Sequence, residues 1–259
     1  MPAALEKITV GDGDAAREIA VRHRAGKTPG ICWLGGFMSD MKGTKAQALD
    51  EWSAVNGHAC TRFDYSGHGE SSGRFEDGTI SRWLEEASVV FARTEGPQIV
   101  VGSSMGGWIA LLLTQVRRAT GAATRIAGLL LVAPAVDMTE ELMWKKFPKA
   151  VRKEIETAGA WRQPSDYSAE PYLITRALIE DGRKHLFGDR LIETGCPVHI
   201  FQGINDTEVP AAHASHLLTH LASDDAVLTL VKDGDHRLSR PDDLLRLTKA
   251  VEGLIAEAR

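Results

Sequence analysis

Ser104 lies at the centre of the clearest chemical motif in the chain, GSSMG at 102–106, which has the pattern G-x-S-x-G. Glycines around a serine let the backbone turn tightly from a strand into a helix, and the turn lifts the hydroxyl clear of the sheet. The surrounding run IVVGSSMGGWIALLL is typical of strand, turn and helix in that order. We interpret Ser104 as a nucleophile for acyl transfer. The alternative is a serine that only caps a helix.

A serine nucleophile needs a base and an acid, and in this setting they follow the serine in the order acid, then histidine. His236 stands just after a predicted strand, and loops at the carboxyl ends of strands are where parallel sheets carry their sites. Asp206 follows the preceding predicted strand and is the candidate to accept a hydrogen bond from His236. Glu208 and Asp137 are the alternatives for the acid.

The other histidines fit the role of base less well. His213, His216 and His220 have helical spacing, and a solvated helix face is the simpler interpretation of them. A metal site built from these three is not expected, because no carboxylate or cysteine is clearly arranged to complete it. The sequence therefore predicts neither a metal ion nor a cofactor.

Acyl transfer also needs backbone N–H groups aimed at the position where the carbonyl oxygen becomes negative. One donor is expected from Met105, the residue after the nucleophile, and the other from a loop after an early strand. That loop is LGGFM at 34–38. The N–H of Phe37 is the first candidate in it and the N–H of Met38 is the second.

These loops meet only if the elements between them form one sheet. Short apolar runs alternate with amphipathic stretches along most of the chain. Strands are predicted at 17–23, 30–34, 59–63, 98–101, 126–132, 198–202 and 227–231, and helices at 44–56, 80–92, 104–118, 211–221 and 241–256. Strands that alternate with helices imply crossover connections, a mostly parallel central sheet and an α/β fold.

One stretch, at 136–190, interrupts this alternation and contains no convincing strand. It mixes methionine, leucine and aromatic residues with several lysines. We predict a small helical cap inserted into a core formed by 1–135 and 191–259. The alternative is a surface excursion whose aromatic side chains simply pack on the core.

Composition narrows the class of protein. Of 259 residues 43% are hydrophobic, which is enough for a sizeable core, and the net charge of −5 argues against a general nucleic-acid binder. The three cysteines, Cys32, Cys60 and Cys196, are widely spaced and odd in number, so buried free thiols in a reducing compartment are expected. No signal peptide or run long enough to span a membrane is visible, and we predict a cytoplasmic protein. The oligomeric state is not readable from the sequence.

With these residues identified, the chain resembles the α/β-hydrolase superfamily over nearly its whole length. Three segments go further: WLGGFMSDMKGTKA at 33–46, ACTRFDYSGHGESSG at 59–73 and VGSSMGGW at 101–108. Together with WRQPSDYS at 161–168 and DHR at 235–237, they resemble the mycophenolic acid acyl-glucuronide esterase family, whose members are also described as palmitoyl-protein thioesterases.

This resemblance implies a triad of Ser104, Asp206 and His236, a compact cap, and a small-molecule ester or thioester substrate with an apolar acyl part. The superfamily often has His-Gly in the loop that supplies the oxyanion donor, where this chain has Gly35-Gly36.

The DYSGHG run at 64–69 superficially suggests a metal or phosphate site. In hydrolases of this type the run looks like a structural loop, and we expect its polar side chains to make hydrogen bonds there.

Other functions on the same framework are open. Haloalkane dehalogenases and epoxide hydrolases use an aspartate at the position of Ser104, so the serine argues against both. An aminopeptidase would need an acid in the cap, for which Glu140, Glu141 and Glu170 are candidates. A non-catalytic binding protein that has kept the fold is a further alternative, although such proteins tend to lose one member of the triad.

Overall fold

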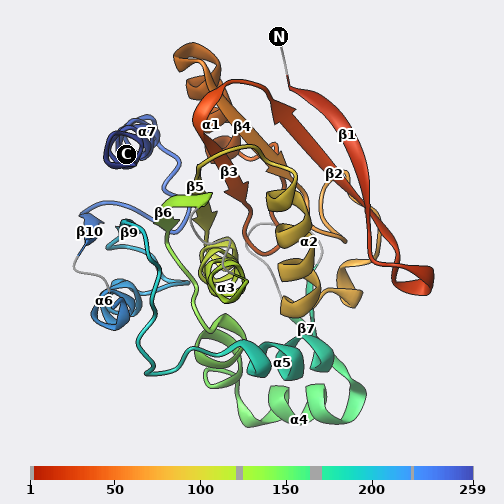
Figure 1. The fold of residues 1–259 in the computed structure, drawn as a ribbon. Coiled ribbons are helices and arrows are strands. Elements are labelled where there is room, and N and C mark those ends of the chain that lie inside the picture. Colours follow the sequence, from red (N-terminus) through yellow and green to blue (C-terminus); the bar gives the residue numbers. More distant parts are fainter. Residues whose placement is uncertain (1–2, 121–124, 164–170, 223–224, 259) are drawn as a thin grey trace.

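The computed structural model describes residues 3–120, 125–163, 171–222 and 225–258 (Figure 1). Within them the main sheet has eight strands in the order β1-β2-β4-β3-β5-β6-β9-β10. The strands are β1 Ala4–Val10, β2 Arg17–Arg24, β3 Lys27–Leu34, β4 His58–Phe63, β5 Gln98–Ser103, β6 Ile126–Val132, β9 Val198–Gly203 and β10 Ala226–Val231. β2 pairs antiparallel with β1 and β4, and the remaining neighbours pair in parallel, which confirms the predicted α/β fold with a mostly parallel sheet.

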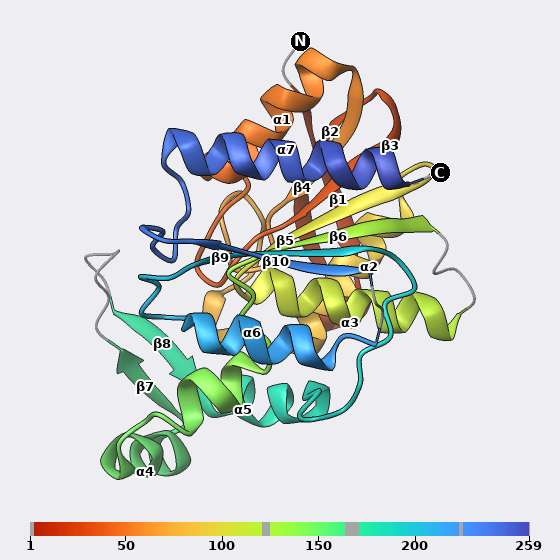
Figure 2. The same cartoon turned by 90° about the vertical axis from the view of Figure 1, so that its left-hand side faces the viewer.

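Helices cover both faces of this sheet, as Figure 2 shows. Outside the insertion they are α1 Thr44–Asn56, α2 Ile80–Ala92, α3 Met105–Ala119, α6 Ala211–His220 and α7 Pro241–Glu257, with short 3-10 helices at Gly13–Ala15 and Phe75–Asp77. Helices α1 and α7 lie on one face, and α2, α3 and α6 lie on the other. The sheet is therefore buried on both sides, as crossover connections require.

The central strands show why the chain folds this way. In β5 the side chains of Ile99 and Val101 pack on the face covered by α1 and α7, while Val100 packs on the opposite face. Neighbouring β6 divides its leucines in the same manner. Because successive side chains of a strand point to opposite faces, a continuous apolar run is what a strand buried on both sides needs.

The edge of the sheet differs from the prediction. β1 was not expected, and it pairs along its whole length with β2. Its burial pattern explains the omission, because only Ile8 and Val10 among its residues are buried. An edge strand with one polar, exposed half carries little of the apolar signal that identifies a strand in a sequence.

The segment 136–190, called the insertion below, also differs in part from the prediction. As expected it is partly helical, with a π-helix at Thr139–Trp144, α4 Lys149–Ala158, α5 Arg176–Gly182 and a 3-10 helix at Arg183–His185. However, two short strands, β7 Ala160–Gln163 and β8 Tyr172–Thr175, pair antiparallel as a separate small sheet. Four-residue strands are too short to show a clear alternation. Residues 164–168 of the WRQPSDYS stretch, and Glu170, lie outside the described residues.

All three cysteines are described, buried and unpaired, and burial raises the pKa of each thiol to about 12. In the part of the chain that the structure describes, no helix is long and apolar enough to cross a membrane.

Candidate active site

Ser104 lies at a sharp turn between β5 and α3. Its φ of 54° and ψ of −119° place a non-glycine residue in a region of backbone space that is sparsely populated. Two hydrogen bonds tie the turn to the segment of β6 and the residues after it, from the Ser104 N–H to the Val132 carbonyl and from the Ala135 N–H to the Ser104 carbonyl, and the Gly107 N–H also donates to that carbonyl. The neighbouring strand β6 therefore fixes the backbone on which the hydroxyl stands.

The glycines of the G-x-S-x-G motif are required by close backbone packing. A Cβ on Gly106 would overlap the carbonyl oxygen of Leu34, and a Cβ on Gly102 would overlap the carbonyl of Gly106. Helix α3 thus starts directly against the end of β3. This is the structural reason for the sequence pattern, and it brings the loop after β3 next to Ser104.

The structure brings Ser104, His236 and Asp206 together. His236 Nε2 lies 3.1 Å from Ser104 Oγ, and His236 Nδ1 lies 2.8 Å from Asp206 Oδ2. Both distances are within hydrogen-bond range. The carboxylate accepts at Nδ1, so Nδ1 carries the proton and Nε2 is free to accept the proton of the serine hydroxyl.

Asp206 is anchored in a buried position. Its side chain is 0% exposed, and Oδ1 accepts the N–H groups of Glu208 and Val209 while Gln202 donates to Oδ2. Burial alone would raise the pKa of this carboxyl, but the hydrogen bond and charge of His236, with the Val209 N–H and Gln202, hold the pKa below its usual value. The acid is therefore ionised and fixed in place beside the imidazole.

The two alternative acids have different surroundings. Glu208 approaches the other nitrogen of the ring, with Oε2 3.6 Å from His236 Nε2, on the side where Ser104 lies. Asp137 accepts the N–H groups of Phe187 and Gly188 and is occupied with the loop that leaves the insertion. Of the three acids weighed from the sequence, only Asp206 bonds Nδ1.

The loop after β3 packs against the turn at Ser104. A Cβ on Gly36 would lie 3.3 Å from both the Ser103 carbonyl oxygen and Ser104 Cβ. The Met38 N–H donates to His68 Nε2 at 3.2 Å, so it is already engaged. Phe37 N–H makes no hydrogen bond within the described residues, and Met105 N–H, at the start of α3, has no intrahelical acceptor. Phe37 and Met105 therefore keep the donors that an oxyanion would need.

The loop at 64–69 supports the loop at 34–38 through hydrogen bonds. This is the structural role that we expected for its polar side chains. His68 donates from Nδ1 to the Ser66 carbonyl, which leaves Nε2 as the acceptor for Met38. Asp64 accepts the N–H groups of Met41 and Glu70 at 2.6 and 2.7 Å. Sequence reasoning missed the bond between His68 and Met38, since nothing in either segment indicates which backbone group the imidazole meets.

A cavity of about 510 Å³ opens at Ser104 and His236. On the side of the insertion its wall is mostly apolar and includes Met138, Leu142, Met143, Phe147 and Tyr172. The other lining residues are largely polar, and among them Lys45 donates from Nζ to the carbonyl of Arg237, directly after His236. Burial lowers the pKa of Lys45 to about 8. The lining thus has an apolar half, contributed mainly by the insertion, and a polar half, contributed by loops of the core.

Of the cap acids considered for an aminopeptidase, Glu140 and Glu141 are engaged elsewhere, and Glu170 lies outside the described residues. Glu140 accepts from Arg183 at 2.9 Å, and Glu141 pairs with Lys145 at 2.5 Å. Glu141 lines a different cavity from the one that holds Ser104. Neither acid offers the free carboxylate that an amino group of a substrate would need.

Several known proteins are similar to this chain over most of its length. A family model described as the alpha/beta hydrolase family matches residues 28–247. The human palmitoyl-protein thioesterase ABHD10, which is named as mitochondrial, is 35% identical over 239 residues, covering 92% of this chain and 76% of the relative. The orangutan (Pongo abelii) protein of the same name is 36% identical over the same shares. The cytoplasmic location expected from the sequence stays a prediction.

Solved structures of similar proteins share the fold of this chain. A crystal structure of a protein from Agrobacterium vitis S4 superposes with a TM-score of 0.93 at 48% identity, over 98% of this chain and 100% of the other. Alpha/beta hydrolase domain-containing protein 10 from mouse superposes with a TM-score of 0.87 at 32% identity, over 99% of this chain and 100% of the other. Both alignments extend through the insertion as well as the core.

Proposed function

The chain belongs to the alpha/beta hydrolase family, and from that premise we propose that it is a serine hydrolase acting on carboxylic esters or thioesters with an apolar acyl group. The observation that carries the proposal is the continuous set of hydrogen bonds from Asp206 through His236 to Ser104. The thioesterase names of the relatives support the same class of substrate.

In the first half of the proposed reaction, Ser104 Oγ attacks the acyl carbonyl carbon while His236 Nε2 takes the hydroxyl proton. The carbonyl electron pair moves to oxygen, and the resulting oxyanion accepts hydrogen bonds from the N–H groups of Phe37 and Met105. Asp206 stabilises the imidazolium that forms at His236. No proton has to reach Asp206, whose low pKa keeps it ionised throughout.

In the second half, the oxyanion collapses and the bond to the leaving alcohol or thiol breaks. His236 gives its proton to the leaving group, and the acyl group remains on Ser104 as an ester. Water then enters, His236 removes one of its protons, and the acyl carbonyl is attacked again. Release of the acid returns the proton to Ser104 Oγ, and no cofactor takes part.

The two halves of the cavity support the substrate class. Side chains of Met138, Leu142 and Phe147 offer the acyl chain an apolar wall, because burying methylene groups there removes them from water. The polar half, which includes Lys45, offers hydrogen-bonding groups to the more polar part of such a substrate. An ester or thioester with an apolar acid part and a more polar leaving part matches this division.

The direct test is hydrolysis of acyl p-nitrophenyl esters and acyl thioesters of graded chain length. Wild-type protein should turn over both classes, and Ser104→Ala should lower kcat by at least about 10⁴-fold while the chain stays folded. Ser215→Ala, an exposed serine of α6, is the matched control and should behave as wild type. Normal turnover by Ser104→Ala would overturn the proposal.

A further inference from the structure

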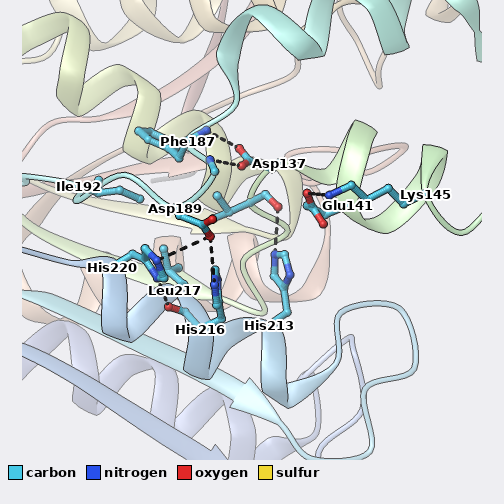
Figure 3. Close-up of a pocket in the computed structure, with 12 residues that line it drawn as sticks. Asp137, Glu141, Lys145, Phe187, Asp189, Ile192, His213, His216, Leu217 and His220 are labelled. Carbon is cyan, nitrogen blue, oxygen red and sulfur yellow. Dashed lines mark hydrogen bonds and ion pairs between the residues drawn. The ribbon is translucent and has the colours of Figure 1, made fainter.

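A second cavity, of about 440 Å³, is shown in Figure 3 and is lined in part by the segment 136–145. It is bounded by that segment, the loop at 187–192 and helix α6, and it shares no lining residue with the cavity at Ser104. Histidines and carboxylates dominate its polar wall. Because none of them contacts the proposed reacting atoms, they need a separate explanation.

Three side chains in this second cavity converge on one point. Asp189 Oδ1 lies 3.7 Å from His216 Nε2 and 4.0 Å from His220 Nε2. The two histidines are one helical turn apart on α6, with ring centroids separated by 4.2 Å, so they present the same face. One potential ligand atom from each of the three residues lies within 4.8 Å of the other two.

The protonation pattern of His220 leaves a lone pair facing the carboxylate. Its Nδ1 lies 2.8 Å from the carbonyl oxygen of His216, which can only accept, so Nδ1 donates. In the neutral ring Nε2 is then an acceptor directed at Asp189. At 3.7 and 4.0 Å both imidazole nitrogens face the carboxylate as neighbours, but they lie beyond hydrogen-bond distance from it.

The loop that carries Asp189 is held in position. Asp137 accepts the N–H groups of Phe187 and Gly188 at 2.9 and 2.8 Å, and Arg190 Nε donates to the Phe187 carbonyl. The Asp189 side chain is 93% exposed, so it can turn toward an ion without first losing buried contacts. A fixed backbone with a free carboxylate is a suitable arrangement for a ligand that closes around an ion.

The neighbouring polar groups of this cavity have other partners. His213 Nε2 lies 3.0 Å from the Val136 carbonyl and must donate to it. Glu141 is paired with Lys145. This separates His216, His220 and Asp189 from the rest of the lining and defines the ligand set by its geometry.

We propose that Asp189, His216 and His220 bind a first-row transition-metal ion, and specifically Zn²⁺, with water completing the coordination. Two imidazole nitrogens and one carboxylate oxygen suit Zn²⁺ and disfavour Mg²⁺ or Ca²⁺, which take oxygen ligands. Ligand atoms around tetrahedral zinc stand about 3.4 Å apart, so the three atoms need to move by less than ~1 Å. The ion links the loop at 187–190, which leaves the insertion, to α6, which follows the loop of Asp206.

The sequence indicated a solvated helix face for these histidines, and His216 is exposed. The proposed site adds to this face a carboxylate that the sequence analysis did not find. The missing carboxylate belongs to a loop from a distant part of the chain. Asp189 lies where the chain returns from the insertion to the core, so the residue spacing within α6 does not predict it.

Isothermal titration calorimetry of the full, chelator-treated chain with zinc chloride tests the site. Wild type should bind Zn²⁺, and the double variant His216→Gln/His220→Gln should lose at least about tenfold in affinity for this site. His23→Gln removes an exposed histidine from β2 and should leave zinc binding unchanged. Asp189→Asn, which alters one exposed side chain, provides a second variant with the same expected direction.

Thermal unfolding supplies a readout that is independent of hydrolysis. Zn²⁺ should raise the Tm of wild type and of His23→Gln, since an ion that binds only the folded chain stabilises it. It should raise the Tm of Asp189→Asn and of the double variant less. Absence of zinc binding to wild type, or equal affinity in wild type and Asp189→Asn, would overturn the proposal and leave the hydrolase proposal untouched.

Discussion

Two clusters of histidine and carboxylate lie near the segment 136–145, and the fold holds them differently. The first cluster takes Ser104, His236 and Asp206 from three separate loops. Hydrogen bonds of 3.1 and 2.8 Å join the His236 ring to Ser104 and to Asp206, whose carboxylate is 0% exposed. In the other cluster, two histidines share one helical turn and lie 3.7 and 4.0 Å from the carboxylate of Asp189, which is 93% exposed.

The difference follows from the chemistry that each arrangement suits. Proton transfer requires short, fixed hydrogen bonds before the substrate arrives, so the rigid core must assemble the groups. An ion supplies its own attraction and can draw in ligands that are only near one another. Changes at the first cluster should therefore act on rate, and changes at the second should act on ion affinity.

The largest predicted effect in this comparison concerns the acid of the first cluster. Asp206→Asn should lower kcat for an ester by about 10⁴-fold, because an amide no longer selects the His236 tautomer that accepts from Ser104. The measurement is steady-state hydrolysis with circular dichroism to verify folding.

Asp137→Asn is the matched control, since Asp137 is also a buried carboxylate that accepts two backbone N–H groups. It borders the second cavity and does not contact His236. We expect it to retain kcat within about tenfold of wild type. Equal losses in the two variants would show that the contrast between the clusters is wrong.

A smaller effect is predicted for His68, which holds the oxyanion loop through the Met38 N–H. His68→Ala should lower kcat by about 10-fold to 100-fold with little change in KM, because the loop of Phe37 loses its support while the substrate cavity keeps its walls. His68→Gln should recover part of the loss, since its amide oxygen can accept from Met38. A change confined to KM would contradict this positioning role.

His68 also gives a pH dependence with a defined sign. Burial lowers the pKa of its imidazole, against the opposing influence of the Ser66 carbonyl and Asp40. Its contribution to stability is therefore complete above the unfolded pKa of about 6.5 and is lost as the pH falls through the folded pKa. Denaturant unfolding between about pH 8 and pH 5 should show a smaller loss of stability in His68→Gln than in wild type.

The smallest predicted effect concerns the apolar wall of the cavity at Ser104. Leu142→Ala should reduce kcat/KM for a dodecanoyl ester by roughly fivefold to tenfold, in proportion to the apolar contact removed, and leave an acetyl ester nearly unchanged. A chain-length series in both proteins makes the measurement. An equal reduction for both esters would place the acyl chain elsewhere.

The parts that the sequence predicted well are those in which local pattern and global fold agree. Helices at 44–56 and 80–92 and the strand at 126–132 appear with the expected bounds. Amphipathic spacing accounts for the second helix and a buried apolar run for the strand. The first helix buries Asp50 and Ser53 and exposes Val55, and its end is set by Gly57 in the left-handed conformation. The glycines around Ser104 identify it in the sequence, and the structure shows Gly106 packed against Leu34 and Gly102 packed against Gly106. Chain order then selected Asp206, the acid that bonds Nδ1 of His236.

The parts that escaped prediction depend on contacts between distant loops or on weak local patterns. Edge strand β1 is half exposed, and β7 and β8 have four residues each. The bond from Met38 to His68 and the approach of Asp189 to α6 join segments that no periodicity relates. Such contacts are settled by tertiary packing, so they become visible only in the folded chain.

The most direct test of the central claim is labelling with a fluorophosphonate, followed by intact mass measurement and peptide mapping. A serine activated by His236 should give one adduct per chain, located on Ser104, and the adduct should be absent from Ser104→Ala and strongly reduced in His236→Ala. Folded wild-type protein that remains unlabelled, or labelling that persists in Ser104→Ala, would contradict the account.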